Sequence, residues 1–136
     1  MLKDTVIAAL EAHFGTGVTL IPSATEFATF EAKHPGVGNV VIEDDGTELT
    51  VSVGNIHDGH FGSYEVNLSD EEREAVIARD IVEFLTDLFD DKFLLYKSRW
   101  GGGWRPVEEG FQRTMLPGKK SWSKWSGPIY PEVETS

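Results

Sequence analysis

Apolar and polar residues alternate along residues 38–68 in a pattern that predicts three antiparallel strands. Asp45-Gly46 separates the first two alternating runs, and Asp58-Gly59 separates the second run from the third. An Asp-Gly pair in such a position is typical of a two-residue β-hairpin loop. With both pairs as loops, the facing residues fall into three rows: Gly38, Val53 and Tyr64; Val40, Val51 and Val66; Ile42, Leu49 and Leu68. This register makes one face of the meander apolar and leaves the other face polar.

A long amphipathic helix is expected directly after the meander. Ser69 and Glu72 have the spacing of a capping box, in which each side chain bonds to the other residue's backbone amide. Apolar residues then recur at helical spacing: Ile77, Ile81, Phe84, Leu85 and Leu88. This stripe is wide enough to cover the apolar face of the meander.

Three shorter elements are expected on either side of these two. Residues 4–14 predict a helix that begins at Asp4 and stops at Gly15. Residues 25–33 alternate in polarity and predict a strand. Residues 92–100 predict a second strand in the same sheet, which would make the long helix a right-handed crossover between strands.

The C-terminal part completes the expected architecture. The chain returns after residue 103 as the partner of the strand over residues 92–100, which makes Gly101, Gly102 and Gly103 the hairpin loop. Residues 117–136 are rich in Pro, Gly and Ser and predict an irregular tail. The sequence therefore predicts one α+β domain over residues 1–136: an antiparallel β-meander covered on one face by a long amphipathic helix, with an additional C-terminal β-hairpin.

The charge is distributed unevenly along the chain, whose formal net charge is −11. Residues 1–91 hold 19 Asp and Glu against 4 Lys and Arg, whereas residues 92–136 hold 4 against 8. Such acidity opposes the phosphate attraction that drives nucleic-acid binding. No apolar run is long enough to cross a membrane. The chain has no cysteine, so we expect a cytoplasmic protein, and no motif indicates a cofactor.

The expected long helix carries a row of carboxylates opposite its apolar stripe: Asp80, Glu83, Asp87 and Asp90. Like charges at this spacing destabilise a helix, and carboxylates near its C-terminus oppose the helix dipole. A broken local rule indicates either function or compensation. The functional hypothesis is an exposed face that binds a basic partner. Two alternatives are neutralisation by Lys119, Lys120 and Lys124 of the tail, and a face that only aids solubility.

The favoured interpretation is a non-enzymatic, protein-binding domain that acts on a basic protein. Its composition is similar to that of bacterial inhibitor or immunity proteins, which are small, acidic and free of cysteine and which cap a basic toxin. The oligomeric state is left open by the sequence.

A metal-binding or metal-dependent catalytic site is the first alternative function. In the predicted register His57 faces His60 across the Asp58-Gly59 loop, and His34 lies at the same end of the meander. Asp87, Asp90 and Asp91 at the end of the long helix would point towards this end too. Imidazole and carboxylate groups together are ligands for zinc or another divalent metal. The competing interpretation is that polar residues flank exposed turns.

The segment "RWGGGWR" provides the second alternative. Trp100 and Trp104, with Arg99 and Arg105 outside them, could stack on a base or sugar, and with the basic C-terminal segment they could bind nucleic acid or a glycan. The structural interpretation is that both indoles face each other across the hairpin neck and stabilise it. We favour the structural interpretation.

Overall fold

Five antiparallel strands form the larger sheet, in the order β1 (Thr19–Leu20), β2 (Glu26–Phe30), β3 (Val40–Asp44), β4 (Leu49–Val53) and β5 (His57–Phe61). The computed structural model describes residues 2–46, 48–54, 56–62, 67–98, 101–107 and 121–129. Each strand pairs with the next along the chain, so this sheet is the meander that the sequence predicts, extended by two strands at its N-terminal side.

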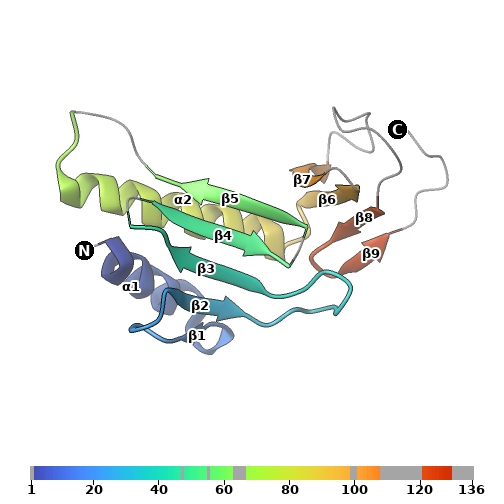
Figure 1. The fold of residues 1–136 in the computed structure, drawn as a ribbon, viewed down its shortest axis with the longest axis horizontal. Coiled ribbons are helices and arrows are strands. Elements are labelled where there is room, and N and C mark those ends of the chain that lie inside the picture. Colours follow the sequence, from blue (N-terminus) through green and yellow to red (C-terminus); the bar gives the residue numbers. More distant parts are fainter. Residues whose placement is uncertain are drawn as a thin grey trace.

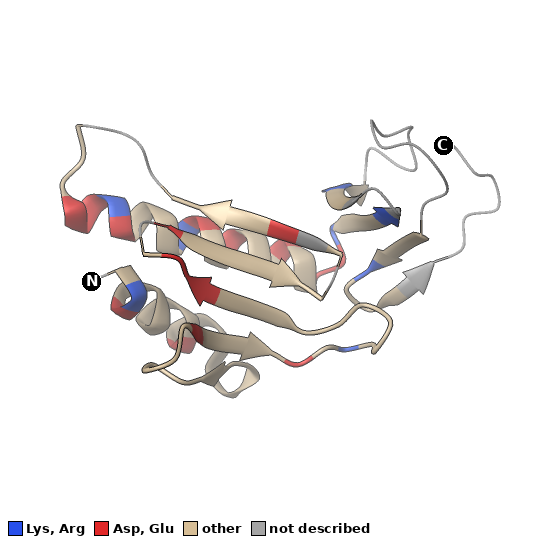
Figure 2. Cartoon of the chain, in the orientation of Figure 1, with Lys and Arg blue, Asp and Glu red and all other residues tan. Residues whose placement is uncertain are grey.

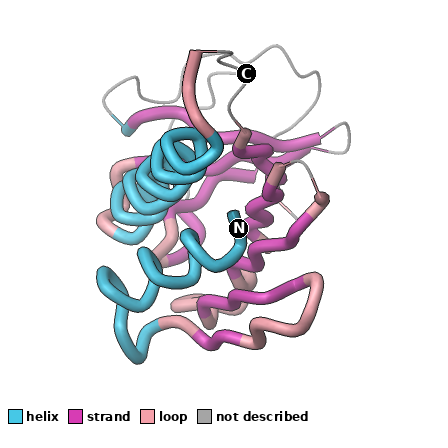
Figure 3. The backbone as a smooth tube through the Cα atoms, turned by 90° about the vertical axis from the view of Figure 1, so that its left-hand side faces the viewer, coloured by secondary structure: helices cyan, strands magenta, loops and turns pink. Residues whose placement is uncertain are grey.

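Two helices cover one face of this sheet. α1 (Leu2–Phe14), followed by the single turn η1 (Gly15–Gly17), lies beside α2 (Asp70–Phe89) (Figure 1, Figure 3). Ser69 caps α2 through the predicted capping box: the Glu72 amide donates to Ser69 Oγ at 3.2 Å, and the Ser69 amide donates to Glu72 Oε1 at 3.1 Å. The α+β class and the covering helix are thereby confirmed.

The core fills the space between the helices and the five-stranded sheet. The predicted stripe of α2 is buried at Ile77, Ile81, Leu85 and Leu88. It packs in one cluster with apolar residues of the strands and of α1: Val40, Ile42, Leu49, Val51, Val53, Phe27, Val6 and Leu10. Burying a side chain of this size stabilises a fold by about 1.5–3 kcal/mol. The covered face of the sheet is therefore fixed by the apolar alternation itself.

The turn between β3 and β4 is longer than the Asp-Gly pair predicts. Ile42 pairs with Val51 rather than with Leu49, so the register differs by two residues from the expectation. β3 ends at Asp44 and four residues precede β4, with the first amide of this loop donating to its last carbonyl at 3.0 Å. Because side chains alternate with a period of two, a shift of two residues keeps the same apolar face.

The turn between β4 and β5 comes earlier than predicted. Val53 pairs with His57 and Leu49 with Phe61, so the predicted partners Tyr64, Val66 and Leu68 are wrong. Asp58-Gly59 lies inside β5, and the chain turns directly after β4, where Gly54 has a φ of 53° that favours glycine. This earlier turn places Phe61 against the core, where its ring lies 5.7 Å from that of Phe84. Tyr64 and Val66 lie outside the described residues.

A second, four-stranded sheet lies beyond the C-terminal end of α2 (Figure 1). Its order is β7 (Gly101–Pro106), β6 (Phe93–Ser98), β8 (Ser121–Lys124) and β9 (Gly127–Ile129). Two expectations are wrong here. The strand after α2 does not join the first sheet, so α2 is not a crossover within one sheet, and the predicted irregular tail contains two strands. Trp122 and Trp125 are buried. Their apolar contacts hold this segment in place although it is rich in Pro, Gly and Ser.

The glycines of "RWGGGWR" belong to a strand instead of a loop. Ser98 pairs with Gly101, so β6 and β7 are joined by residues 99–100 alone. A Cβ at Gly102 would overlap the carbonyl oxygen of Ile56, and one at Gly103 would meet the Tyr96 ring. Glycine is required here because β7 approaches both the first sheet and an aromatic ring closely.

Candidate functional site

Four predicted carboxylates lie on the side of α2 opposite its buried stripe: Asp80, Glu83 and Asp87 within the helix and Asp90 at its C-cap; we call these four residues the acidic stripe. Glu83 and Asp90 are exposed, and Asp80 and Asp87 are half-buried. None of the last helical residues is basic. The negative end of the helix dipole and the carboxylates of the acidic stripe therefore both make the electrostatic potential at the C-terminal end of α2 more negative.

The backbone closes α2 with a six-to-one hydrogen bond and a five-to-two hydrogen bond, as in a Schellman motif. The amide of Lys92 donates to the Asp87 carbonyl at 3.0 Å, and the amide of Asp91 donates to the Leu88 carbonyl at 3.1 Å. Asp91 has a φ of 59°, in the position that glycine usually takes. Its carboxylate accepts a hydrogen bond from the Ser126 amide at 2.9 Å, which ties the turn before β9 to the end of α2. An aspartate here joins the helix to the second sheet, which glycine could not do.

Two basic side chains neutralise part of the acidic stripe. Arg79 Nη2 lies 3.4 Å from Asp80 Oδ1, and Lys92 Nζ lies 3.5 Å from Asp87 Oδ1. Both cations are 63% exposed, and exposed pairs contribute about 0–1 kcal/mol. Within the described part of the chain, these are the two ion pairs of the acidic stripe. The proposed compensation by tail lysines falls on Lys119 and Lys120, outside that part, and on Lys124, which is half-buried in β8.

The charge asymmetry of the sequence corresponds to the two sheets (Figure 2). Acidic positions lie along α2 and on strands and loops of the first sheet, whereas Lys97, Arg105 and Lys124 lie on the second sheet. Arg79 and Lys92 reduce the negative field of the acidic stripe but leave its sign unchanged, because the stripe has four carboxylates.

Two hollows lie at the C-terminal end of α2. One has a volume of about 190 Å³ and is lined mainly by aromatic rings, including Phe89 of the last helical turn. The other has a volume of about 510 Å³ and includes Asp87 and Asp91 in its wall. The acidic stripe therefore ends beside concave surfaces, which are the usual places for a ligand group to enter a protein.

The predicted facing of His57 and His60 across a loop is wrong. His57 and His60 do not face each other, because they lie three positions apart on β5 and pair with Val53 and Thr50. His60 lies at the Asp45 end of β5, whereas the ring of His34 lies beside Gly127 of β9. The early turn after β4 is the physical reason, since it puts both β5 histidines into a strand rather than around a loop. The Asp91 carboxylate accepts a hydrogen bond from the Ser126 amide.

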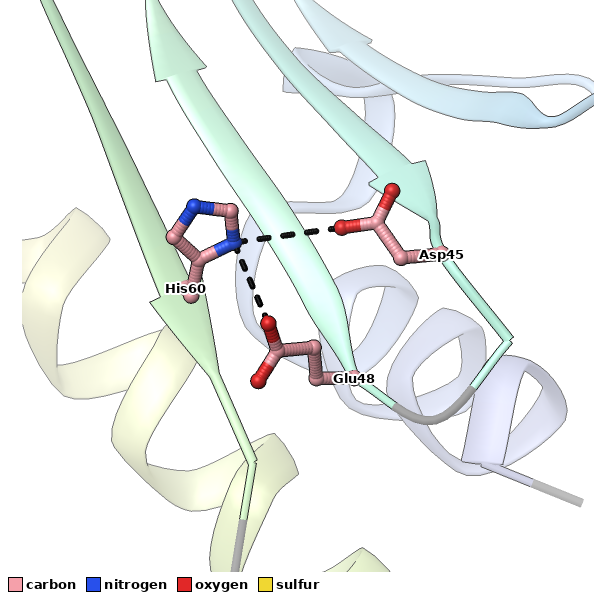
Figure 4. A group of neighbouring side chains, drawn as sticks. All are labelled: Asp45, Glu48 and His60. Carbon is pink, nitrogen blue, oxygen red and sulfur yellow. Dashed lines mark ion pairs between the residues drawn. The ribbon is translucent and has the colours of Figure 1, made fainter.

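His60 instead meets two carboxylates, a cluster that sequence reasoning missed (Figure 4). Its Nδ1 lies 3.3 Å from Glu48 Oε1, 3.9 Å from Asp45 Oδ2 and 3.1 Å from Thr50 Oγ1. The Thr50 hydroxyl also donates a hydrogen bond to Asp45, and Nε2 of His60 faces away from both carboxylates (Figure 4). This cluster lies on the sheet face opposite the helices.

The described contacts make this cluster a brace for the β3–β4 turn. Imidazole and carboxylate are metal ligands, and the ligand atoms of these three residues lie within 4.8 Å of one another. The same atoms are each other's hydrogen-bond and ion-pair partners, and they tie a four-residue loop to the neighbouring strand. Only the pairing of Thr50 with His60 could have revealed the cluster, and the predicted register excluded that pairing.

The tryptophan loop is also arranged differently from the prediction. Trp104 pairs with Leu95 across β6 and β7, so it does not close the hairpin neck opposite Trp100. Its ring is 38% exposed and lies 4.3 Å from Phe93 and 5.8 Å from Phe84, which connects the second sheet to α2. Arg105 is half-buried in β7, and Arg99 and Trp100 lie outside the described residues.

No protein-family model, curated protein or solved structure matches this chain. Neither helix of the described segments combines the length and the apolar character needed to cross a membrane.

Proposed function

We propose that the protein is a non-enzymatic binding domain whose acidic stripe docks a basic partner protein. One observation carries this proposal: two carboxylates of the stripe, those of Asp87 and Asp90, stay half-exposed and exposed at the end of α2, where the helix dipole disfavours them. A purely structural helix gains stability by placing cations there. Asp87 and Asp90 instead strengthen a negative field that a basic surface can use.

The rest of the molecule supports the same type of partner. The net charge of −11 lies mostly on the part of the chain that contains α2, and such a field accelerates encounters with cationic proteins. Hollows beside the last turn of α2 offer places for side chains of the partner. An inhibitor of the immunity type, acting in the cytoplasm, has these properties. Nucleic acid is excluded from this proposal because its phosphates would meet the acidic stripe.

Charge reversal on the stripe tests the proposal. The tagged protein is used to isolate partners from a lysate of its source, and association rates are measured for each basic partner at 20 and 150 mM salt. Glu83→Lys combined with Asp87→Lys is expected to slow association about ten-fold at low salt and to flatten its salt dependence, because both changes weaken long-range attraction.

The matched control is Glu26→Lys combined with Asp58→Lys. Both positions are exposed and lie on the sheet, and the change in net charge is the same. The control is expected to alter association no more than about two-fold at physiological salt, where screening acts over about 8 Å. Equal losses in both variants would show that only net charge matters, and unchanged rates in the stripe variant would refute the proposed function.

A further inference from the structure

Four aromatic rings from distant parts of the chain meet at the end of α2. Phe14 ends α1, Phe30 ends β2, Phe89 ends α2 and Trp125 lies in the turn between β8 and β9. Together with Gly17 they line the hollow of about 190 Å³. We call it the aromatic pocket.

The rings form walls at steep angles to one another. Phe14 meets Phe30 at 83° and Phe89 at 79°, with centroids 5.1 and 5.6 Å apart. Phe89 lies 4.9 Å from Trp125 at 46°. Phe30 and Trp125 are buried, whereas Phe14 and Phe89 are half-exposed and therefore partly accessible to solvent. At about 30 Å³ per water molecule, the space suits a group of a few heavy atoms.

Among the described residues that line the aromatic pocket, one is charged, and it is acidic. This residue, Glu31, follows Phe30 directly and is exposed. Phe89 is followed by Asp90, the last member of the acidic stripe. Aromatic faces carry a negative electrostatic potential, and a nearby carboxylate adds to it. The pocket is therefore complementary to a cation with a flat or apolar surface.

We propose that the aromatic pocket receives an arginine side chain of the basic partner. Guanidinium is planar, is more weakly hydrated than ammonium, and stacks on aromatic rings. Its fork of N–H donors can bind the Glu31 carboxylate while its plane lies against the rings. A lysine ammonium would lose more hydration and could not stack. This inference rests on the proposed function, because the partner's basic surface on the acidic stripe brings its side chains to the neighbouring pocket.

A small arginine derivative tests the aromatic pocket without any partner protein. The full chain is titrated with N-acetyl-arginine methylamide, and the indole N–H signal of Trp125, assigned with a Trp125→Phe variant, is followed by NMR. N-acetyl-citrulline methylamide is the matched probe, since it has the same shape without the charge. The arginine probe is expected to shift the Trp125 signal in a saturable way, and the citrulline probe to leave it in place.

Glu31→Gln removes the carboxylate of the pocket and Glu26→Gln removes a comparable exposed carboxylate from the start of β2. The first change is expected to weaken binding of the arginine probe about five-fold, the loss of an exposed charge pair, and the second to leave it unchanged. Equal shifts with both probes would identify a merely apolar pocket and overturn the proposal. Absence of any shift with arginine would overturn it as well.

The two proposals fail in different ways. The variant with Glu83→Lys and Asp87→Lys is expected to keep the response of Trp125 to the arginine probe. If the probe binds but reversal of the stripe leaves partner association unchanged, the proposed function is wrong and the pocket still binds arginine. If reversal slows association but the probe never binds, the pocket proposal is wrong and the proposed function stands.

Discussion

The two ends of α2 have similarly acidic sequences and follow opposite rules. At the N-terminus, Asp70, Glu71 and Glu72 lie in the first turn, where the helix dipole favours carboxylates, and the capping box satisfies two backbone amides. At the C-terminus, the acidic stripe continues to Asp90 with no basic residue in the last turn. Local interactions therefore stabilise one end and destabilise the other.

Burial of apolar side chains is greater at the C-terminal end of α2 than at its N-terminal end. The first buried residue of α2 is Ile77, two turns after the helix begins. Before it, the Thr5 hydroxyl of α1 donates a hydrogen bond to Glu74 Oε1 at 3.1 Å. In the last two turns Leu85 and Leu88 are fully buried, and Phe89 packs against other rings. The comparison teaches that tertiary packing at the C-terminal end offsets the unfavourable charges, which leaves them available for binding.

The largest expected effect comes from removing that packing. Leu88→Ala leaves a cavity beneath the last turn and is expected to destabilise the protein by about 2–5 kcal/mol in urea denaturation followed by circular dichroism. Val76→Ala, at a half-buried position nearer the N-terminus, is the matched change and is expected to cost about 1 kcal/mol or less. Similar losses at both positions would show that packing is not concentrated at the C-terminal end.

A smaller effect is expected at the N-terminal end, where local interactions dominate. Ser69→Ala removes the hydroxyl that accepts from the Glu72 amide and is expected to cost about 1 kcal/mol. Ser69→Thr keeps an accepting hydroxyl and is expected to restore most of this stability. Hydrogen exchange should accelerate first at the amides of residues 70–73, and a uniform acceleration along α2 would contradict a local role for the cap.

Opposite signs are expected when a single exposed carboxylate is neutralised at each end. Glu71→Gln loses a favourable interaction with the helix dipole and is expected to destabilise the protein by about 0.3–1 kcal/mol, whereas Asp90→Asn is expected to stabilise it by a similar amount. Thermal denaturation at 20 mM and 1 M salt measures both. The difference should shrink at high salt because exposed charges are screened. Effects of the same sign would contradict the comparison.

The smallest effect concerns pH and the capping box. Hydrogen bonds from the backbone and side chain of Ser69 lower the pKa of Glu72 below its ordinary 4.5. A lowered pKa in the folded state means that this carboxylate stabilises α2 above pH 4.5, and that the contribution is lost as the pH falls through the lowered pKa. Stability measured from pH 6 to pH 2 should therefore decline less for Glu72→Gln than for the wild type. If stability declined equally with pH in both proteins, protonation of Glu72 would not affect the stability of α2.

Several elements were predictable because their signals are local. The capping box, the buried stripe of α2 and the alternation of β3 and β4 follow from nearest neighbours and from a fixed periodicity, and the structure has them all. The acidic stripe was predictable for the same reason, since a helix places residues at this spacing on one side. Turn positions were not predictable from Asp-Gly pairs, because a glycine at Gly54 and the burial of Phe61 favour an earlier turn.

The candidate site shows where sequence reasoning stops. Asp80, Glu83, Asp87 and Asp90 could be grouped in advance because they follow helical spacing along one helix and its C-cap. The aromatic pocket could not, since its rings lie at positions 14, 30, 89 and 125 and only the packing of both sheets around the end of α2 brings them together. His60, Asp45 and Glu48 meet only in the register that the structure adopts.

The sequence by itself determined the class of the fold, the helix that covers the sheet and the face of that helix that stays charged. These features depend on hydrogen bonding and burial within short stretches, where spacing alone decides the outcome. Only the tertiary structure decided that β6 joins a second sheet, that the tail supplies β8 and β9, and that the end of α2 holds an aromatic pocket. Such features depend on which of several distant segments packs against a given apolar surface, and this is decided by the packing of the whole chain.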